Sequence, residues 1–203
     1  MDSVLDIANT LFGGDVNRMF TNYRTKTYND FISLIDETLK DIILDIENQK
    51  NSYSKLGEDA LTSIIIGQLI RAGFDASHDK NIGGHADIVI EKDNFQWLGE
   101  AKVHKDYGWL LQGFNQLTTR YSSGKHPNNY GGLIIYNKNK DAKSVIDEWK
   151  VHLQQNIPET IIVDNPDDPL SFVSEITHGS SGLPYKVQHY CVLLHHMPKD
   201  TKK

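Results

Sequence analysis

Apolar positions recur every three to four residues in two long stretches of the chain, a spacing that predicts amphipathic helices. The first stretch covers residues 28–49 and the second covers residues 56–72, where Gly73 follows as a residue suited to ending a helix. The same spacing predicts further helices over residues 109–121 and 141–155. Each helix has one apolar face, so we expect all of them to pack against a shared core.

Short runs rich in β-branched and apolar residues lie between and after these helices and predict strands. They cover residues 74–77, 85–90, 96–103, 131–136, 160–163, 171–176 and 185–195. Alternation of strands and helices favours an α/β fold with a partly parallel sheet. We expect the last two strands to pair across a loop at residues 179–182. Before residue 25 the pattern is mixed, and Gly13-Gly14 is expected to interrupt any helix there.

The strands over 85–90 and 96–103 are separated by a short polar segment that favours a tight turn. If the chain reverses at the centre of this segment, residue 92 faces residue 95 and Asp87 comes opposite Glu100. Residues opposed on one face of an antiparallel pair have Cβ atoms about 4.5–5.5 Å apart. The hairpin is therefore expected to bring two carboxylates together.

Lys102 is expected to project from the same face as Glu100, because side chains alternate along a strand. Two like charges this close are costly without a cation between them, and carboxylate oxygens are the ligands that Mg²⁺ prefers. A metal held here could polarise a phosphoryl oxygen, while the amine orients the nucleophile. The alternative is a surface hairpin on which Glu100 and Lys102 stand side by side in solvent. The apolar neighbours on both strands favour burial instead.

Asp87 followed by Glu100-Ala101-Lys102 resembles the D…ExK signature of the PD-(D/E)xK (restriction-endonuclease-like) nuclease superfamily. Longer similarity is to an uncharacterised bacterial branch of this superfamily, in residues 83–88, 98–103, 116–117 and 133–141. The resemblance covers about residues 55–150. Ala86 stands where the superfamily has a proline, at a position that shapes the strand and binds no metal.

The resemblance implies a restriction-endonuclease-like core, in which helices flank a mixed β-sheet. We expect a single domain over residues 1–203. Its nuclease core would cover about 53–155, with a helical N-terminal extension at about 1–52 and a C-terminal β extension at about 156–198.

The resemblance also implies further site residues. In this superfamily an acid at the start of the helix before the hairpin commonly completes the metal site. Glu58 and Asp59 both stand there, where acids also simply favour a helix N-terminus, and Glu58 is preferred. The backbone carbonyl of Ala101 is expected to be another metal ligand. Gln116, on the helix that follows the hairpin, is expected to hold metal-bound water or substrate.

The expected function is a metal-dependent endonuclease, with Mg²⁺ as cofactor and Mn²⁺ as a substitute. Asp87, Glu100 and Glu58 would hold the metal and Lys102 would orient the attacking water. Expected partners are nucleic acid, with DNA favoured over RNA, a second copy of the chain, and other subunits of a restriction or anti-phage defence system. One alternative is a nuclease fold used for binding or assembly without cleavage. An α/β enzyme of small phosphorylated molecules is disfavoured, because no Gly-rich phosphate loop is present.

Composition adds few constraints. The net charge of −6 speaks against non-specific coating of nucleic acid, so phosphate contacts would depend on a local basic patch. Candidates for that patch are Lys102, His104, Lys105, Arg120, Lys125 and His126. The single cysteine, Cys191, fits a reducing cytoplasm, and no apolar run approaches the roughly 20 residues of a membrane span. The start of the chain lacks the pattern of a signal peptide, so we expect a cytoplasmic protein.

Overall fold

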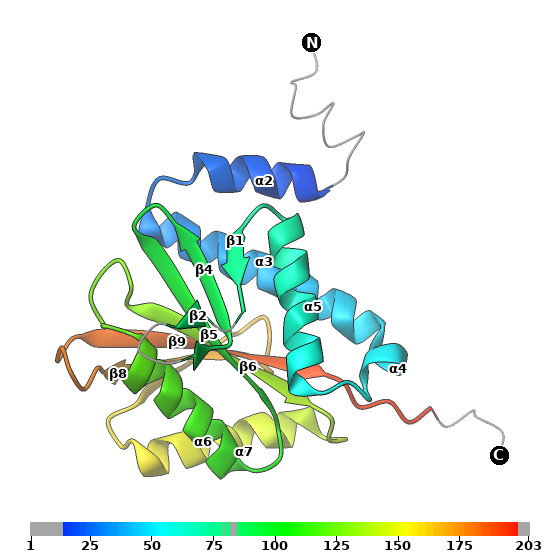
Figure 1. Ribbon diagram of the computed structural model, residues 1–203. Coiled ribbons are helices and arrows are strands. Elements are labelled where there is room, and N and C mark those ends of the chain that lie inside the picture. The colour runs from blue at the N-terminus through cyan, green and yellow to red at the C-terminus, as the bar shows by residue number, and fades with distance from the viewer. Residues whose placement is uncertain (1–13, 79, 82–84, 199–203) are drawn as a thin grey trace.

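A seven-stranded mixed sheet forms the centre of an α/β fold in the computed structural model, which describes residues 14–78, 80–81 and 85–198 (Figure 1). The strands lie in the order β1 (Asp75–Ser77), β4 (Ile88–Lys92), β5 (Phe95–Val103), β6 (Tyr130–Asn137), β9 (Pro184–Leu193), β8 (Phe172–Thr177) and β7 (Ile161–Asp164). The neighbours β5, β6 and β9 are parallel, and the other pairs are antiparallel. A separate small pair is formed by β2 (Lys80–Asn81) and β3 (His85–Ala86).

Helices cover both faces of the sheet (Figure 1). One face packs against α3 (Tyr28–Asn48) and α5 (Glu58–Arg71), with α2 (Gly14–Arg24) beside α3 and the short α4 (Lys50–Tyr53) after it. The other face packs against α6 (Tyr107–Gln116), its π-helical continuation η1 (Leu117–Tyr121) and α7 (Ala142–Asn156). None of the helices in the described part of the chain has the length and apolar content that a membrane span requires.

The predicted hairpin register is confirmed. Lys92 pairs with Phe95 and Ile88 pairs with Gly99, so the next position along the hairpin sets Asp87 against Glu100. Asp93 in the turn has φ of 55°, in the left-handed region that aspartate tolerates better than most residues.

The indole of Trp97 fills the centre of the sheet face that α3 and α5 cover. Its side chain is fully buried, and a Cβ at Gly99 or at Gly132 would come within 2.6 and 2.4 Å of its ring. Neither neighbour can therefore carry a side chain. These two glycines let the large ring lie flat across β5 and β6.

Three sequence predictions need correction. Gly14 begins helix α2 instead of interrupting one, while Gly13 lies outside the described residues. Tertiary contact favours this helix, because Asn22 Nδ2 donates to the Gly73 carbonyl at 2.8 Å. No strand was predicted between residues 77 and 85, yet Lys80–Asn81 form strand β2, while residues 79 and 82–84 lie outside the described part. The helix predicted from residue 109 begins at Tyr107, because the Asp106 side chain caps it.

The C-terminal strands belong to the central sheet. The predicted pairing of β8 with β9 is confirmed, and β9 also pairs along its length with β6, from Tyr130–Lys186 to Asn137–Leu193. Residues predicted as an extension of the core thus supply a central strand of its sheet.

Candidate functional site

Three carboxylates surround one ammonium group at the C-terminal end of β5. Lys102 Nζ lies 2.6 Å from Glu100 Oε1, 3.6 Å from Asp87 Oδ2 and 3.6 Å from Glu58 Oε1. Glu100 and Lys102 project from β5, Asp87 lies between β3 and β4, and Glu58 is the first residue of α5. The structure thus brings together the four charged residues that were predicted from the sequence to form the site.

The carboxylates of Asp87 and Glu58 accept backbone hydrogen bonds from β5 beyond the point where its pairing with β4 ends. β4 pairs with β5 only as far as Gly99. Beyond that point the Ala101 N–H donates to Asp87 Oδ2 at 2.9 Å, and the Val103 N–H donates to Glu58 Oε2 at 2.7 Å. Both side chains are therefore oriented by the backbone of β5, because buried N–H groups need acceptors.

The start of α5 is tied to the sheet, which fixes the place of Glu58. The Thr62 hydroxyl donates to the Glu58 carbonyl at 2.9 Å and lies 3.0 Å from the Tyr136 hydroxyl on β6. Since the Thr62 proton is already used, Tyr136 is the donor in the second bond. Asp59, the alternative acid in this turn, is exposed.

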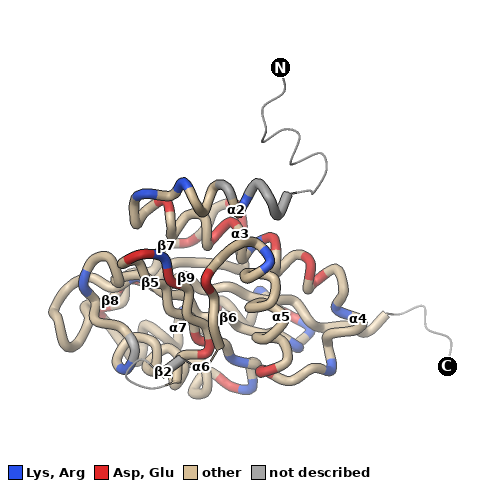
Figure 2. Tube along the Cα trace, turned by 45° about the horizontal axis from the view of Figure 1, so that its top comes forward, with Lys and Arg blue, Asp and Glu red and all other residues tan. Residues whose placement is uncertain are grey.

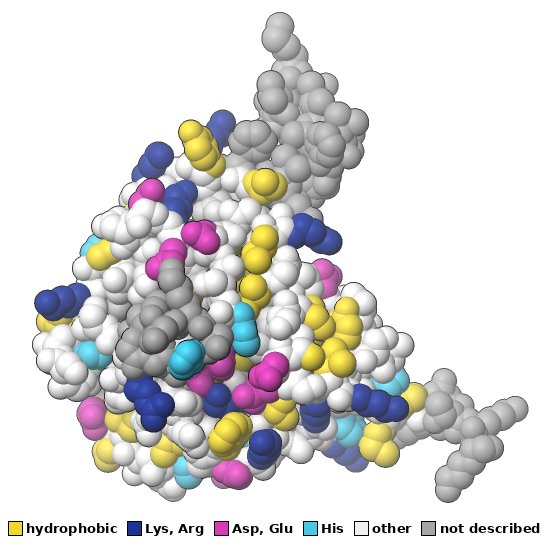
Figure 3. Space-filling model, viewed as in Figure 1, with side chains coloured by type: hydrophobic (Ala, Val, Ile, Leu, Met, Phe, Trp, Pro, Cys, Tyr) yellow, Lys and Arg dark blue, Asp and Glu magenta, His cyan; other side chains and the backbone are white. Residues whose placement is uncertain are grey.

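The site is buried at its base and open at its rim. The side chains of Glu100 and Lys102 are 2% and 7% exposed, whereas those of Asp87 and Glu58 are 28% and 25% exposed. Figure 3 shows acidic side chains gathered near the middle of the molecular face, between α5 and α6, with basic side chains next to them. A ligand would therefore meet Asp87 and Glu58 first.

Burial changes the ionisation of both inner groups. It raises the pKa of Glu100 to about 7, helped by the charges of Asp87 and Glu58 and opposed by the hydrogen bond from Lys102. Burial alone would lower the pKa of Lys102, but its hydrogen bond to Glu100 and the surrounding carboxylates raise it overall. Lys102 thus stays an ammonium, while Glu100 titrates near neutrality. Such perturbed groups concentrate at functional sites.

The donor chemistry of the site fits a hard divalent cation. Three carboxylates converge, and Glu100 Oε2 is buried without a hydrogen-bond partner among the described residues. Their arrangement is nevertheless that of acids gathered around a lysine. Within residues 14–78, 80–81 and 85–198, no group of three or more His, Cys, Asp and Glu side chains is positioned to hold a metal ion. A metal would have to displace the Lys102 ammonium from the centre of this group.

Helix α6 packs against the side of the site, and it comes close to Lys102 and Glu100 at Gly113. A Cβ at Gly113 would lie 2.9 Å from Lys102 Cγ, 3.1 Å from Lys102 Cε and 3.3 Å from Glu100 Cγ. Trp109 and Gln116 lie one turn before and one turn after Gly113, so helical periodicity puts them on the same face. Helix α6 can lie this close to Lys102 and Glu100 because Gly113 has no side chain.

Substituting Gly113 with alanine is expected to lower any activity of this site at least tenfold, because the new Cβ displaces the stem of Lys102. Alanine favours a helix by roughly 0.5–1 kcal/mol over glycine, which offsets part of the steric cost in stability. The control is Gly67→Ala in α5, where a Cβ has open space. This control should gain stability in urea unfolding and keep full activity. Equal activity of the two variants would contradict the expected role of Gly113.

The other predicted site residues are placed less directly. Gln116 Oε1 is buried without a hydrogen-bond partner among the described residues, and no bond from it to the carboxylates is found there. Ala101 is fully buried and binds Asp87 through its N–H, so the predicted role of its carbonyl as a metal ligand stays a prediction.

The predicted basic patch is not gathered in one place. Lys102 and Lys105 lie at the C-terminal end of β5, whereas Lys125 and His126 precede β6, which runs parallel to β5. The two groups therefore lie at opposite ends of the sheet. Figure 2 shows basic and acidic positions interspersed along the chain, in keeping with this separation.

Two residues of the site were missed by the sequence reasoning. Gly113 was treated as an ordinary helix position, although a glycine inside a helix is itself a signal of close packing. Trp109 was assigned to the start of a helix, yet its ring lies 5.4 Å from Lys102 Nζ and 4.6 Å from Lys105 Nζ.

Comparisons of this chain with protein-family models, with curated proteins and with solved structures find no match.

Proposed function

We propose that this protein is a metal-dependent nuclease of the PD-(D/E)xK kind that hydrolyses phosphodiester bonds of nucleic acid, with DNA favoured as substrate. The observation that carries this proposal is the buried Glu100–Lys102 pair at the end of a central strand, with the partly exposed carboxylates of Asp87 and Glu58 above it. Burying such charges costs several kcal/mol per ion, which a merely structural role would not repay. A restriction-endonuclease-like core is part of the same proposal, and the hairpin β4–β5, followed by α6 and the parallel strand β6, supports it.

Each residue has a distinct task in the proposed reaction. Asp87, Glu100 and Glu58, with the Ala101 carbonyl, would hold Mg²⁺ or Mn²⁺. When bound, the metal would polarise a phosphoryl oxygen and acidify a water molecule. Lys102, released from Glu100, would orient the attacking water and stabilise charge that builds on the phosphate. Gln116, with its unpaired buried oxygen, would accept a hydrogen bond from that water. The expected products carry a 3′-hydroxyl and a 5′-phosphate.

The proposed biological setting follows from the resemblance of the motif segments. It is a bacterial restriction or anti-phage defence system, in which the chain acts as a homo-oligomer or with other subunits. The expected location is the cytoplasm.

A second candidate function is nucleic-acid binding or complex assembly without cleavage. The position of Lys102 favours it, because the ammonium already neutralises the carboxylates that a metal would need. If Lys102 stayed paired with these carboxylates, the protein would keep its fold but would not cleave nucleic acid.

Substituting Asp87 with asparagine is expected to reduce cleavage at least 100-fold, since one negative ligand is lost. The amide oxygen still accepts a hydrogen bond from the Ala101 N–H, so the fold should be kept. The measurement is incubation of plasmid, linear duplex, single-stranded DNA and RNA with Mg²⁺ or Mn²⁺, followed by analysis of the product ends. Cleavage should require metal and the wild-type residue. Equal cleavage by both proteins would indicate a contaminant, and binding without cleavage by the wild type would favour the second candidate.

A further inference from the structure

Four of the eight buried polar side-chain atoms without a hydrogen-bond partner in the described part of the chain belong to the candidate site or to the segments next to it. They are Glu100 Oε2, His104 Nε2, Trp109 Nε1 and Gln116 Oε1, which come from β5, the residue after it and α6. Buried polar groups in folded proteins are normally hydrogen-bonded, so a group of exceptions calls for a partner outside the chain. The end of β5 and the start of α6 thus form a surface prepared for a polar ligand.

Trp109 belongs to this surface, and its backbone is fixed by the cap of α6. It stands in the first turn of α6, where its backbone N–H donates to the capping side chain of Asp106 at 2.7 Å. Its ring is half-buried, with Lys102 Nζ at 5.4 Å and Lys105 Nζ at 4.6 Å from its centre. Because Lys102 Nζ itself lies 2.6 Å from Glu100 Oε1, the ring centre lies within about 8 Å of that carboxylate oxygen.

The other two tryptophans of the chain are core residues. Trp97 and Trp149 are both fully buried, whereas Trp109 keeps part of its ring exposed next to charged groups. Trp109 therefore differs from both core tryptophans in having part of its ring accessible to a ligand. An aromatic face beside lysines is the combination on which single-stranded nucleic acid binds, with bases on the ring and phosphates on the cations.

We propose that Trp109 is a stacking platform for an unpaired base next to the scissile phosphate, and that Lys105 binds a neighbouring phosphate. This inference rests on the proposed function and specifies its substrate class, which is single-stranded DNA or a strand with unpaired bases at the cleavage point. A base inside an intact duplex is stacked on both faces and is not available to the ring. Lys105 is exposed, so its ammonium can leave the ring for a phosphate when the base arrives.

The test uses the full chain in EDTA, where cleavage cannot occur, and compares labelled oligo-dT with a blunt duplex of equal length by fluorescence anisotropy. Wild type should bind oligo-dT at least tenfold more tightly than the duplex. Trp109→Ala should weaken the binding of oligo-dT by roughly 5- to 150-fold, the range for loss of one base–aromatic stack. Lys105→Ala should reduce the slope of log affinity against log salt by about 0.7, as for one single-strand phosphate contact. The matched control is Tyr23→Ala on α2, which removes a 79% exposed aromatic side chain outside the candidate site. This variant should change neither the affinity for oligo-dT nor its salt dependence.

Intrinsic fluorescence gives an independent readout. Oligo-dT should quench the wild type, and Trp109→Phe should abolish that quenching while keeping much of the affinity, because Trp97 and Trp149 are shielded. Trp109→Phe also guards against a folding defect in the alanine variant. Unchanged fluorescence, equal binding by Trp109→Ala, or a Trp109-dependent preference for duplex would each overturn the inference. Trp109-dependent binding by a protein that never cleaves would uphold the stacking of an unpaired base on Trp109 and refute only the proposed hydrolysis.

Discussion

Replacing Glu100 with glutamine is expected to abolish metal-dependent cleavage and, at the same time, to stabilise the metal-free protein at pH 8. Activity should fall at least about 1,000-fold, because a charged group at the centre of the site is lost. The gain in stability follows from burial and the charge of Asp87, which raise the pKa of Glu100 from 4.5 to about 7. Opposite changes in activity and stability are expected of a residue kept for function at a cost to folding.

The sign of the stability change follows from the direction of the pKa shift. Because the pKa is higher in the folded protein, stability is fully present below about pH 4.5 and is lost as the pH rises through about 7. Glutamine resembles the protonated carboxyl and avoids this loss. The variant should therefore match wild type near pH 4.5 and exceed it at pH 8 by up to about 3 kcal/mol in the free energy of unfolding.

Urea unfolding at several pH values, together with a cleavage assay, measures both effects. The exposed Glu159 supplies a control, since Glu159→Gln should alter neither activity nor stability. A Glu100→Gln protein that cleaves like wild type would contradict the proposed chemistry. A variant that is less stable than wild type at pH 8 would contradict the electrostatic account alone.

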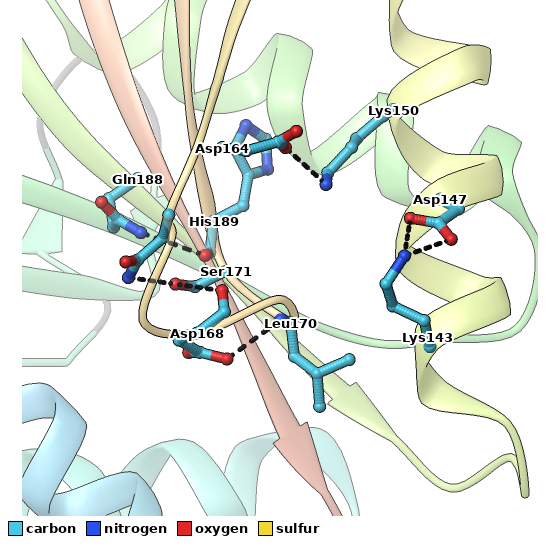
Figure 4. Close-up of polar contacts among 10 residues, drawn as sticks. Lys143, Asp147, Lys150, Asp164, Asp168, Leu170, Ser171, Gln188 and His189 are labelled. Atoms are coloured by element: carbon cyan, nitrogen blue, oxygen red, sulfur yellow. Dashed lines mark hydrogen bonds and ion pairs between the residues drawn. The ribbon is translucent and has the colours of Figure 1, made fainter.

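Acidification from pH 7 to pH 5 is expected to destabilise the protein by about 2 kcal/mol through His189 alone. This side chain is fully buried, and burial and the charge of Lys150 lower its pKa from 6.5 to about 3. A lowered pKa means that stability is fully present above about pH 6.5 and is lost as the pH falls toward 3. Figure 4 shows His189 together with the pair of Lys150 and Asp164, which joins α7 to β7 at 2.7 Å.

The hydrogen bonds of His189 explain why it resists protonation. Trp149 Nε1 donates to His189 Nδ1 at 3.1 Å, so Nδ1 carries no proton. The other nitrogen, Nε2, therefore carries the proton and donates to Ser174 Oγ at 2.8 Å. The ring also stacks on Phe172 at 4.0 Å. A proton on Nδ1 would face the indole N–H, and the charge would lie in an apolar environment.

Urea unfolding at pH 7 and pH 5 checks this expectation. His189→Gln keeps an acceptor for Trp149 and a donor for Ser174, and it should show a smaller loss of stability between the two pH values than wild type. The exposed His196 supplies a control, since His196→Gln should keep the full pH dependence of wild type. If His189→Gln were as acid-sensitive as wild type, the loss would have to arise elsewhere.

Local patterns were enough to predict most of the elements and the register of the central hairpin. Strict spacing of apolar residues predicted α3, α5 and α7, because one buried stripe along each helix packs against the sheet. The polar turn at residues 93–94 fixed the hairpin, and a shift of one residue would have put Glu100 on the opposite face. Helix α2 was missed because its stability depends on distant contacts, such as that of Asn22 with Gly73.

The charged residues of the site could be predicted, but their mutual arrangement could not. Strand alternation was sufficient to group Asp87, Glu100 and Lys102. The approach of Glu58 to Val103 links residues 45 positions apart, and the hairpin alone does not specify it. The contact of Gly113 with Lys102 likewise depends on how α6 packs.

The place of β9 in the sheet has a consequence for how the protein is made. This strand leaves the ribosome after every other strand described here, yet it inserts between β6 and β8 and pairs with both. Until then β6 presents an open, strongly apolar edge, which is a template for pairing with other nascent chains. Formation of β1, β4, β5 and β6 during translation would therefore leave an aggregation-prone intermediate, whose lifetime is set by the delay before the residues of β9 emerge.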